Sequence, residues 1–227
     1  MSMSVESIVI ATDLNKTFKA EQKGLDDVQA LQGINMQIKT GQLTALVGPD
    51  GAGKTTFLRL IAGLYEPTTG SLKVLGMDVA KDPQFVQDRI SYMPQKFGLY
   101  EDLSIQENLD LYADLHGVPM DVRKERFARL LKITDLARFT ERPAGKLSGG
   151  MKQKLGLACT LVRSPELLLL DEPSVGVDPL SRRDLWIIIE QLVREESLSV
   201  ILSTAYMDEA ERCHQVYVML DGQVLKQ

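Results

Sequence analysis

The segment from Gly48 to Thr55 constrains this chain most, because its residues Gly-Pro-Asp-Gly-Ala-Gly-Lys-Thr match the pattern G-x-x-x-x-G-K-[ST] in full. An apolar run typical of a β-strand, Leu43–Val47, precedes it, and a run typical of a helix, Thr56–Ile61, follows it. Glycines allow the loop to wrap tightly, so its backbone N–H groups and the start of the following helix together attract an anion. The sequence therefore predicts a strand–loop–helix unit that binds the phosphates of a nucleoside triphosphate.

Two side chains of this loop have the chemistry that such a ligand needs. The ammonium of Lys54 can reach the outer phosphates, and the hydroxyl of Thr55 can hold Mg²⁺. We expect nucleotide contacts from the whole segment, which consists of Gly48, Pro49, Asp50, Gly51, Ala52, Gly53, Lys54, Thr55 and Thr56.

A second polar site is predicted where another strand ends. The apolar run Leu167–Leu170 is followed directly by two carboxylates, Asp171 and Glu172. Such a run is typical of a strand buried on both faces of a parallel sheet, and ligands collect at the carboxyl ends of these strands. We therefore expect Asp171 beside the phosphate loop as a ligand of Mg²⁺, and Glu172 as the group that polarises an attacking water.

The bulk composition limits the class of protein. The 227 residues are 44% hydrophobic and 25% charged, which suits one large α/β domain. The net charge of −5 argues against a nucleic-acid partner, and two cysteines outside any motif suit a reducing compartment. The apolar runs are all shorter than the roughly 18 residues that a membrane span needs. The chain starts Met-Ser-Met-Ser and stops at Gln227 inside a strand-like run, from which we expect a piece of a longer polypeptide.

The predicted elements alternate between strands and helices, with a helical stretch in the middle. Ser104 and Glu107 form a capping box for a helix to about Leu115, and Asp121 can cap a second, amphipathic helix. Ser181 is expected to cap a later helix. Strands are expected at 8–11, 30–38, 43–47, 71–75, 89–93, 166–170 and 199–203, helices at 151–162 and 206–213, and a hairpin at 216–225. This order predicts an α/β fold with a helical subdomain inserted at about 96–146.

The segment Leu147–Gln153, Leu-Ser-Gly-Gly-Met-Lys-Gln, adds a second glycine-rich helix start. Two glycines after a serine, directly before a helix, expose backbone N–H groups to an anion. One chain with two phosphate sites of different design is unusual for a simple kinase.

Taken together, these segments resemble the nucleotide-binding domain of the ATP-binding-cassette (ABC) family over nearly the whole chain. The resemblance implies a P-loop NTPase with an ABC-type α/β core, an antiparallel β subdomain and an inserted α-helical subdomain, all in one domain over residues 1–227. It implies that ATP and Mg²⁺ bind, that Gln95 contacts the metal and the attacking water, and that Phe18 stacks on adenine. It adds Ser148, Gly149, Gly150 and Asp178 to the nucleotide-binding residues.

Three segments, 47–56, 92–100 and 202–210, resemble the drug- or antibiotic-exporting branch, and in particular bacterial proteins in which two such domains are fused in tandem. The resemblance implies a head-to-tail pair with a second ATPase domain, the C-terminal half of the same polypeptide. It also implies membrane-spanning permease subunits, and hence a cytoplasmic location at the inner face of the cell membrane. The stretch Lys96–Leu115, with Phe97, Leu99 and Tyr100, is the expected contact with the permease.

One position departs from the family. A histidine that contacts the γ-phosphate normally follows Ser-Thr at the end of the last core strand, but here the residue is Ala205, and His214 lies nine residues further on. A methyl group donates no hydrogen bond, and losing one such donor typically costs about 10²–10³ in rate. We therefore expect this chain's own site to be slow.

Two other functions stay open. An ATP-gated module would bind MgATP and dimerise but hydrolyse very little, because of Ala205. A soluble relative that acts on ribosomes also fits. The DNA-repair type is excluded, since it carries a long coiled coil where this chain has 51 residues between Gln95 and Leu147.

Overall fold

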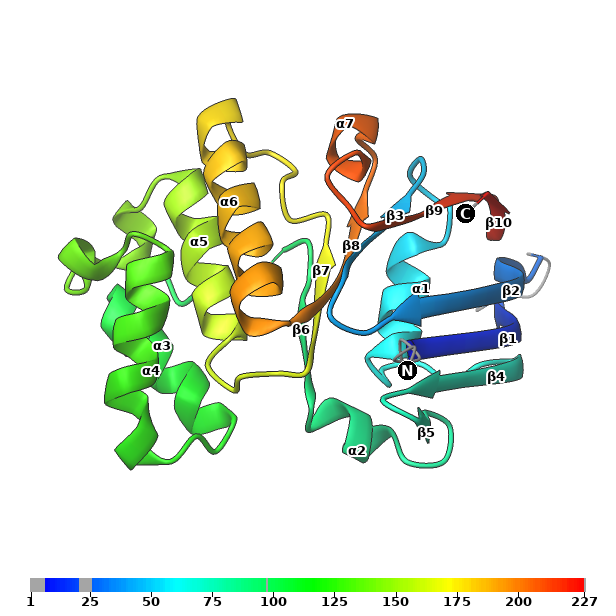
Figure 1. Ribbon diagram of the computed structural model, residues 1–227, viewed down its shortest axis with the longest axis horizontal. Helices are drawn as coiled ribbons and strands as arrows, with labels where there is room; N and C mark the ends of the chain where they lie inside the picture. The colour runs from blue at the N-terminus through cyan, green and yellow to red at the C-terminus, as the bar shows by residue number, and fades with distance from the viewer. Residues whose placement is uncertain (1–6, 21–25, 97, 227) are drawn as a thin grey trace, which may run out of the picture.

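The chain folds around two sheets that share one helix between them (Figure 1). The computed structural model describes residues 7–20, 26–96 and 98–226. Within these ranges the six-stranded sheet has the order β10-β9-β3-β8-β7-β6 and the four-stranded sheet the order β2-β1-β4-β5. The strands are β1 Ser7–Phe18, β2 Val28–Lys39, β3 Leu43–Val47, β4 Thr69–Val74, β5 Met77–Asp78, β6 Ile90–Met93, β7 Leu167–Asp171, β8 Ser199–Thr204, β9 Gln215–Leu220 and β10 Gln223–Lys226.

The six-stranded sheet is parallel from β6 to β9 and buries both of its faces. In β7, Leu168 and Leu170 belong to one hydrophobic cluster, whereas Leu167 and Leu169 belong to the other. Because side chains alternate along a strand, a run of apolar residues supplies both cores at once. β10 joins the edge antiparallel to β9 through the predicted hairpin.

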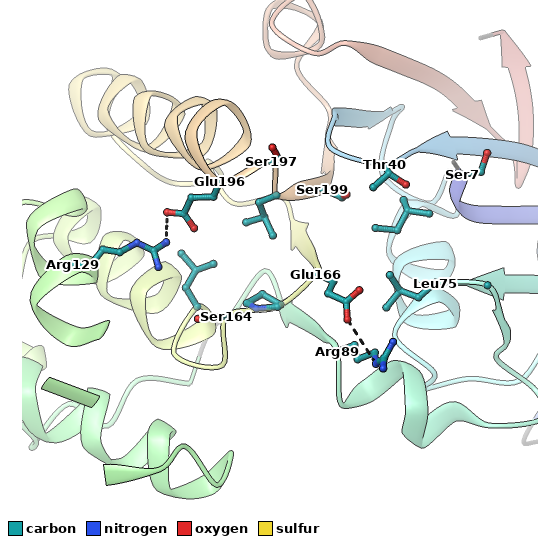
Figure 2. Close-up of a pocket in the computed structure, with 15 residues that line it drawn as sticks. Ser7, Thr40, Leu75, Arg89, Arg129, Ser164, Glu166, Glu196, Ser197 and Ser199 are labelled. Carbon is teal, nitrogen blue, oxygen red and sulfur yellow. Dashed lines mark ion pairs between the residues drawn. The ribbon is translucent and has the colours of Figure 1, made fainter. Parts of the chain in front are cut away.

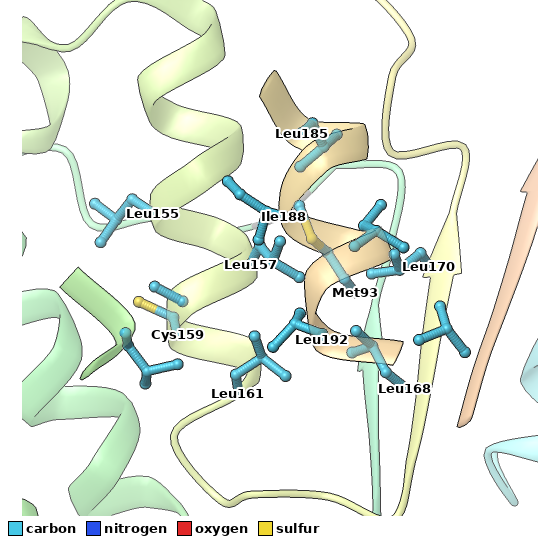
Figure 3. Close-up of a cluster of buried hydrophobic side chains, with 14 of the residues drawn as sticks. Met93, Leu155, Leu157, Cys159, Leu161, Leu168, Leu170, Leu185, Ile188 and Leu192 are labelled. Atoms are coloured by element: carbon cyan, nitrogen blue, oxygen red, sulfur yellow. The ribbon is translucent and has the colours of Figure 1, made fainter. Parts of the chain in front are cut away.

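Helices cover the two faces unequally. The helices are α1 Lys54–Ile61, α2 Pro83–Gln87, α3 Ile105–Leu115, α4 Met120–Ile133, α5 Gly149–Thr160, α6 Pro179–Glu196 and α7 Met207–Ala210. Helices α5 and α6 pack on one face, where Leu157 and Ile188 belong to the same hydrophobic cluster as Leu168 of the sheet (Figure 3). Helix α1 lies on the other face, between this sheet and the four-stranded antiparallel sheet (Figure 1).

The segment between β6 and α5 contains α3 and α4, which stand beyond α5 as seen from the sheet (Figure 1). The capping box predicted at its start is present, since Ser104 Oγ accepts from Glu107 N and Glu107 Oε2 accepts from Ser104 N. Buried apolar residues of both helices, such as Leu109 and Leu130, join the cluster on the α5 and α6 side.

Two predicted helix starts were wrong, and the reason is the same for both. Asp121 lies in the first turn of α4, whose N-cap is Pro119, and Ser181 lies inside α6, which Asp178 caps. In α6 the first residue is Pro179, whose fixed φ suits a first turn, and in α4 Pro119 is itself the N-cap, so both helices begin earlier than the capping patterns suggest. The helix predicted at 206–213 is the short α7, and β5 and α2 were not predicted.

Among the residues that the structure describes, the helices are all too short or too polar to cross a bilayer.

Candidate nucleotide-binding site

Three neighbouring strands end together at the carboxyl edge of the six-stranded sheet. In the order β3-β8-β7, β8 lies between the strand that precedes the glycine-rich loop and the strand that precedes the two carboxylates. Val47 of β3 is paired with Thr204 of β8, and Asp171 of β7 is paired with Ser203. The two motifs are therefore neighbours in space although more than a hundred residues separate them in the sequence.

The loop from Gly48 to Gly53 depends on its glycines. At Gly48 a Cβ atom would lie 2.2 Å from the carbonyl oxygen of Met219, and at Gly53, where φ is 97°, it would lie 2.7 Å from the carbonyl oxygen of Ala30. The backbone therefore packs closely on the neighbouring strands while it turns into α1, whose first residue is Lys54. This is the tight wrapping that a phosphate loop needs.

Lys54 is buried and its ammonium has a partner for each of its three protons. Its Nζ atom donates to the carbonyl oxygens of Gly48, at 2.8 Å, and Pro49, at 3.0 Å, and lies 3.2 Å from Oε1 of Glu172. A phosphate oxygen that reaches Lys54 must therefore compete with the Glu172 carboxylate. The phosphate loop and the second carboxylate are coupled directly through this ion pair.

Asp171 accepts hydrogen bonds from three hydroxyl groups. Thr55 Oγ1 and Ser203 Oγ lie 2.9 and 2.7 Å from its Oδ1 atom, and the Tyr92 hydroxyl lies 2.9 Å from Oδ2. Burial is the largest cause that raises the pKa of Tyr92 to about 12, so the phenol stays protonated and donates. A carboxylate and a hydroxyl side by side are hard oxygen ligands, the donor set that Mg²⁺ prefers, so these residues fit the metal.

Glu172 is aimed by an unusual backbone conformation. Its φ is 49°, in the left-handed region, and its N–H donates to Ser203 Oγ at 2.9 Å. Its carboxylate bridges Lys54 and the side chain of Gln95, whose Nε2 atom lies 2.9 Å from Oε2. A non-glycine residue with positive φ is strained, and such strain clusters at functional sites. The hydrogen bond to Glu172 places Gln95 beside the phosphate loop's cavity.

The predicted adenine contact, Phe18, lies at the side of the same site. A cavity of about 450 Å³ is lined by Phe18, Val28, Gln29, Ala30, Asp50, Gly51, Ala52, Gly53, Lys54, Thr55, Thr56, Gln95 and Glu172. The Phe18 ring meets Tyr65 edge to face at 5.3 Å between centroids, and the Lys16 ammonium lies 4.9 Å from the centre of the Phe18 ring. These contacts fix an aromatic surface at the mouth of the cavity. The predicted contact Pro49 reaches the site through its carbonyl group.

The other predicted nucleotide contacts lie elsewhere. Ser148, Gly149, Gly150 and Asp178 do not line this cavity as far as the described residues define it. They lie near one another instead: a Cβ atom on Gly150 would lie 2.1 Å from Ser181 Oγ, and Ser181 N donates to Asp178 Oδ1 at 3.0 Å. The start of α5 and the start of α6 thus form a second polar surface, built from the motif Leu147–Gln153 and the loop Ser174–Asp178.

Ala205 directly follows β8, the strand that lies between β3, which precedes the phosphate loop, and β7, which precedes the carboxylates. His214 does not replace the missing histidine. Its Nδ1 atom accepts from the N–H of Leu43, at the amino end of β3. Val47 lies four residues further along β3, roughly 13 Å from that end.

Sequence reasoning missed Tyr92 and Ser203. Both hydroxyls position Asp171, but neither residue belongs to a pattern that predicts this contact. Tyr92 stands three residues before Gln95 on β6, and Ser203 is identified only by the register between β7 and β8.

A larger cavity, of about 550 Å³, lies at the opposite, amino edge of the same sheet (Figure 2). Its charged side chains form two separate pairs, Arg89 with Glu166 and Arg129 with Glu196. It contains none of the motif residues predicted to bind nucleotide, as far as the described chain shows. The smaller cavity is therefore the candidate site, because its lining carries the phosphate-binding chemistry.

The chain is similar in sequence to known ATP-binding proteins of transporters. The chain is 52% identical over 222 residues to the probable multidrug ABC transporter ATP-binding protein YbhF of Escherichia coli (strain K12), covering 98% of this chain and 37% of YbhF. It is 34% identical over 206 residues to the Nod factor export ATP-binding protein I of Burkholderia pseudomallei, covering 90% of this chain and 67% of that protein. This chain therefore spans little more than a third of YbhF.

Solved structures agree with the sequence comparison. The dimeric post-hydrolysis state of the ATP-binding cassette MJ0796, bound to ADP and Pi, superposes with a TM-score of 0.84 at 25% identity, covering 96% of this chain and 97% of that one. The structure of cbiO1 from Clostridium perfringens, part of the transporter complex cbiONQ, gives 0.86 at 28% identity, covering 98% and 88%. The fold is thus that of an ABC-type ATPase core. The family profile described as ABC transporter matches residues 31–175, more than half of the chain, and the chain belongs to the ABC transporter family.

Proposed function

We propose that this chain binds and hydrolyses MgATP to power an export transporter. One observation carries the proposal: at the carboxyl edge of the sheet, Glu172 contacts Lys54 and Gln95, and Asp171 contacts Thr55. Ser203 joins the two sets into one network, because its hydroxyl donates to Asp171 and accepts from the N–H of Glu172. The network contains a cation for phosphate oxygens, oxygen ligands for a metal, and a carboxylate beside both. Phosphoryl transfer needs chiefly this combination of positioning and charge stabilisation.

Each residue has a distinct task in this proposal. The loop from Gly48 to Lys54 holds the phosphates, and Phe18 stacks on adenine. Thr55 and Asp171 hold Mg²⁺, with Gln95 as a further contact, and the bound metal neutralises charge on the phosphates. Glu172 orients and polarises the attacking water. Since Glu172 pairs with both Lys54 and Gln95, phosphate binding at Lys54 frees the carboxylate for this task.

A second ATPase domain completes the site in this proposal. Ser148, Gly149, Gly150 and Asp178 lie on a surface of their own, which suits a head-to-tail pair in which they reach the partner's nucleotide. Exposed apolar side chains lie in the same region and would be buried in a pair: Val175, Leu180 and Met207 are 39%, 70% and 61% exposed. Because the chain spans 37% of YbhF, we propose that the partner is a second domain of the same polypeptide.

The proposal includes membrane-spanning permease subunits, and thus a place at the inner face of the cell membrane. We expect them to contact the segment Lys96–Leu115. Tyr100 is half-exposed there and available, whereas Leu99 packs against the core beside α3. Phe97, the third residue expected at this contact, lies outside the described residues. The names of YbhF and of the Nod factor protein support export of a drug or another small molecule.

Titration with a fluorescent ATP analogue in the presence of Mg²⁺ tests the proposal. We expect saturable binding, and a loss of about 30- to 5,000-fold in affinity for Lys54→Ala, because truncating one partner of a buried charge pair costs about 2–5 kcal/mol. Lys81→Ala is the control, since Lys81 pairs with Asp78 and neither residue lines the cavity. Equal affinity of Lys54→Ala and the unchanged protein would refute the nucleotide site.

Ala205 favours a second candidate, a module that uses ATP binding more than hydrolysis. Single-turnover hydrolysis by the full-length protein separates the two functions. We expect Ala205→His to raise the rate at this chain's site by about 10²-fold, because the imidazole restores one donor to the transferring phosphoryl. Ala205→Gln, which also carries a donor but in another geometry, is the control. An unchanged rate in Ala205→His would contradict the slow-site argument.

A further inference from the structure

Glu209 is a buried carboxylate that the proposed site does not use. It lies in α7 and is only 1% exposed. Nothing in the local sequence marks it, since it is one acid in the run Met207-Asp208-Glu209. A buried carboxylate is costly unless several donors satisfy it.

Donors from three separate parts of the chain meet at this carboxylate. Oε1 accepts from Ser174 Oγ at 2.6 Å, from Arg182 Nε at 2.7 Å and from Trp186 Nε1 at 3.2 Å. Oε2 accepts from the hydroxyl of Thr204. Ser174 belongs to the loop after β7, Arg182 and Trp186 to α6, and Thr204 to the end of β8. One side chain thus joins the two segments that flank the proposed site.

The Thr204 end of this bridge leads to the phosphate loop. The carbonyl oxygen of Thr204 accepts from the N–H of Gly48 at 3.3 Å, and its hydroxyl accepts from the N–H of Tyr206 at 3.0 Å. Ala205 lies between these two anchored residues. The backbone that would carry the missing histidine is therefore fixed by contacts to Gly48 and Glu209.

The Ser174 end leads to the surface proposed to meet the partner domain. Ser174 follows Glu172 by two residues, and the N–H of Val175 donates to the Glu172 carbonyl at 3.2 Å. The same loop continues to Asp178, which caps α6. Ser174 therefore lies on the backbone between Glu172 and Asp178, where a movement of either residue would reach it.

We propose that Glu209 is a positioning residue that couples the Thr204–Tyr206 segment, at this chain's own nucleotide, to the Ser174–Asp178 loop, at the partner's nucleotide. The inference rests on the proposed function. Glu209 itself touches neither nucleotide. It holds the two segments together as one rigid unit. Nucleotide binding at this chain's own site therefore changes the position of the loop at the partner's site. The methyl group of Ala205 forms no hydrogen bond, so the coupling runs through the buried carboxylate.

The first experiment compares three variants of the full-length protein by ATP affinity, turnover and melting temperature. Glu209→Ala breaks the bridge, and we expect turnover to fall about 10-fold or more while ATP affinity stays within 3-fold. Glu209→Gln keeps the length, an acceptor for Ser174 and a donor for Thr204, so we expect it to retain at least about a third of the turnover. Asp208→Asn is the control, because Asp208 also pairs with Arg182 but is 73% exposed.

A second experiment stays informative if Glu209→Ala does not fold. Ser174→Ala and Thr204→Val each remove one donor at one end of the bridge. If both act through Glu209, the double variant is at most about 2-fold slower than the slower single variant. Fold-changes that multiply in the double variant would overturn the inference, as would equal losses in affinity and turnover for Glu209→Ala. If the unchanged protein binds no ATP, the proposed function fails instead, so the two failures are distinguishable.

Discussion

The carboxyl and amino edges of the six-stranded sheet both carry cavities, but they connect their charged groups differently. At the carboxyl edge, Lys54 and Glu172 are 4% and 10% exposed and belong to a network that includes Gln95 and, through the Ser203 hydroxyl, Asp171. At the amino edge, in the larger cavity, Arg89 and Glu166 are 47% and 55% exposed and pair only with each other among the ion pairs of the described chain (Figure 2).

The difference shows why volume does not identify the functional cavity. An exposed pair is screened by water and contributes about 0–1 kcal/mol, whereas removing one partner of a buried pair costs about 3–5 kcal/mol. Groups at the carboxyl edge therefore hold one another in fixed positions, as a reaction needs. Groups at the amino edge can exchange partners with water at little cost. The carboxyl edge of the sheet thus carries the proposed nucleotide site, and the amino edge carries a solvent-exposed ion pair.

The largest effect is expected when one glutamate at each edge is replaced and the two variants are compared. We expect Glu172→Gln to lower the hydrolysis rate by about 10²–10⁴-fold, the usual contribution of a general base. ATP affinity should be retained or improved, because Lys54 loses a competing anion. Glu166→Gln at the amino edge should leave both quantities within 2-fold. Steady-state hydrolysis and nucleotide titration give the two readouts, and equal losses in rate for both variants would abolish the contrast.

An intermediate effect is expected from a residue one contact away from the metal ligands. Tyr92→Phe removes the hydroxyl that donates to Asp171, and groups that orient a metal ligand typically affect metal affinity by about 10-fold or more. We expect the Mg²⁺ concentration for half-maximal hydrolysis to rise about 10-fold. Tyr65→Phe is the matched control, since Arg59 forms a hydrogen bond with the hydroxyls of both Tyr65 and Tyr92, but of these two hydroxyls only that of Tyr92 bonds to Asp171 in the described part of the chain. Identical magnesium curves for Tyr92→Phe and the unchanged protein would show that the hydroxyl is dispensable.

The smallest effect should come from the amino edge itself. Arg89→Met keeps much of the side chain's length but removes its charge from the pair with Glu166. We expect the free energy of unfolding to change by less than about 1 kcal/mol, with ATP affinity unchanged. Urea denaturation measures the first quantity. A loss of several kcal/mol would mean that the amino edge is as tightly connected as the carboxyl edge.

The sequence predicted those parts of the site that depend on neighbours along the chain. The strand, glycine loop and helix over 43–61 follow one another directly, as do the strand β7 and its two carboxylates, and the Asp221-Gly222 hairpin is equally local. Such features need only propensity, turn chemistry and an apolar pattern. The ABC resemblance then supplied Gln95, which no local pattern connects to Glu172.

The contacts of Ser203 and Glu209 were not predicted, because they depend on the register of the parallel strands and on the packing of side chains from distant elements. Ser203 meets Asp171 because β7 and β8 pair in one particular register, and strands from distant parts of a chain carry no local signal for that register. Glu209 collects its donors from three elements, so its role depends on packing that a linear pattern does not contain. The wrong starts for α4 and α6 have a simpler cause, because a proline at a helix start competes with a nearby Asp or Ser as the signal.

The backbone at Glu172 has a consequence for anyone who selects heat-resistant forms of this protein. An L-residue held in the left-handed region costs about 1–2 kcal/mol relative to glycine. The local conformation alone therefore favours glycine at the position where the proposed chemistry requires an acid. Screens that reward survival at high temperature would enrich that replacement, so each surviving variant should also be assayed for turnover.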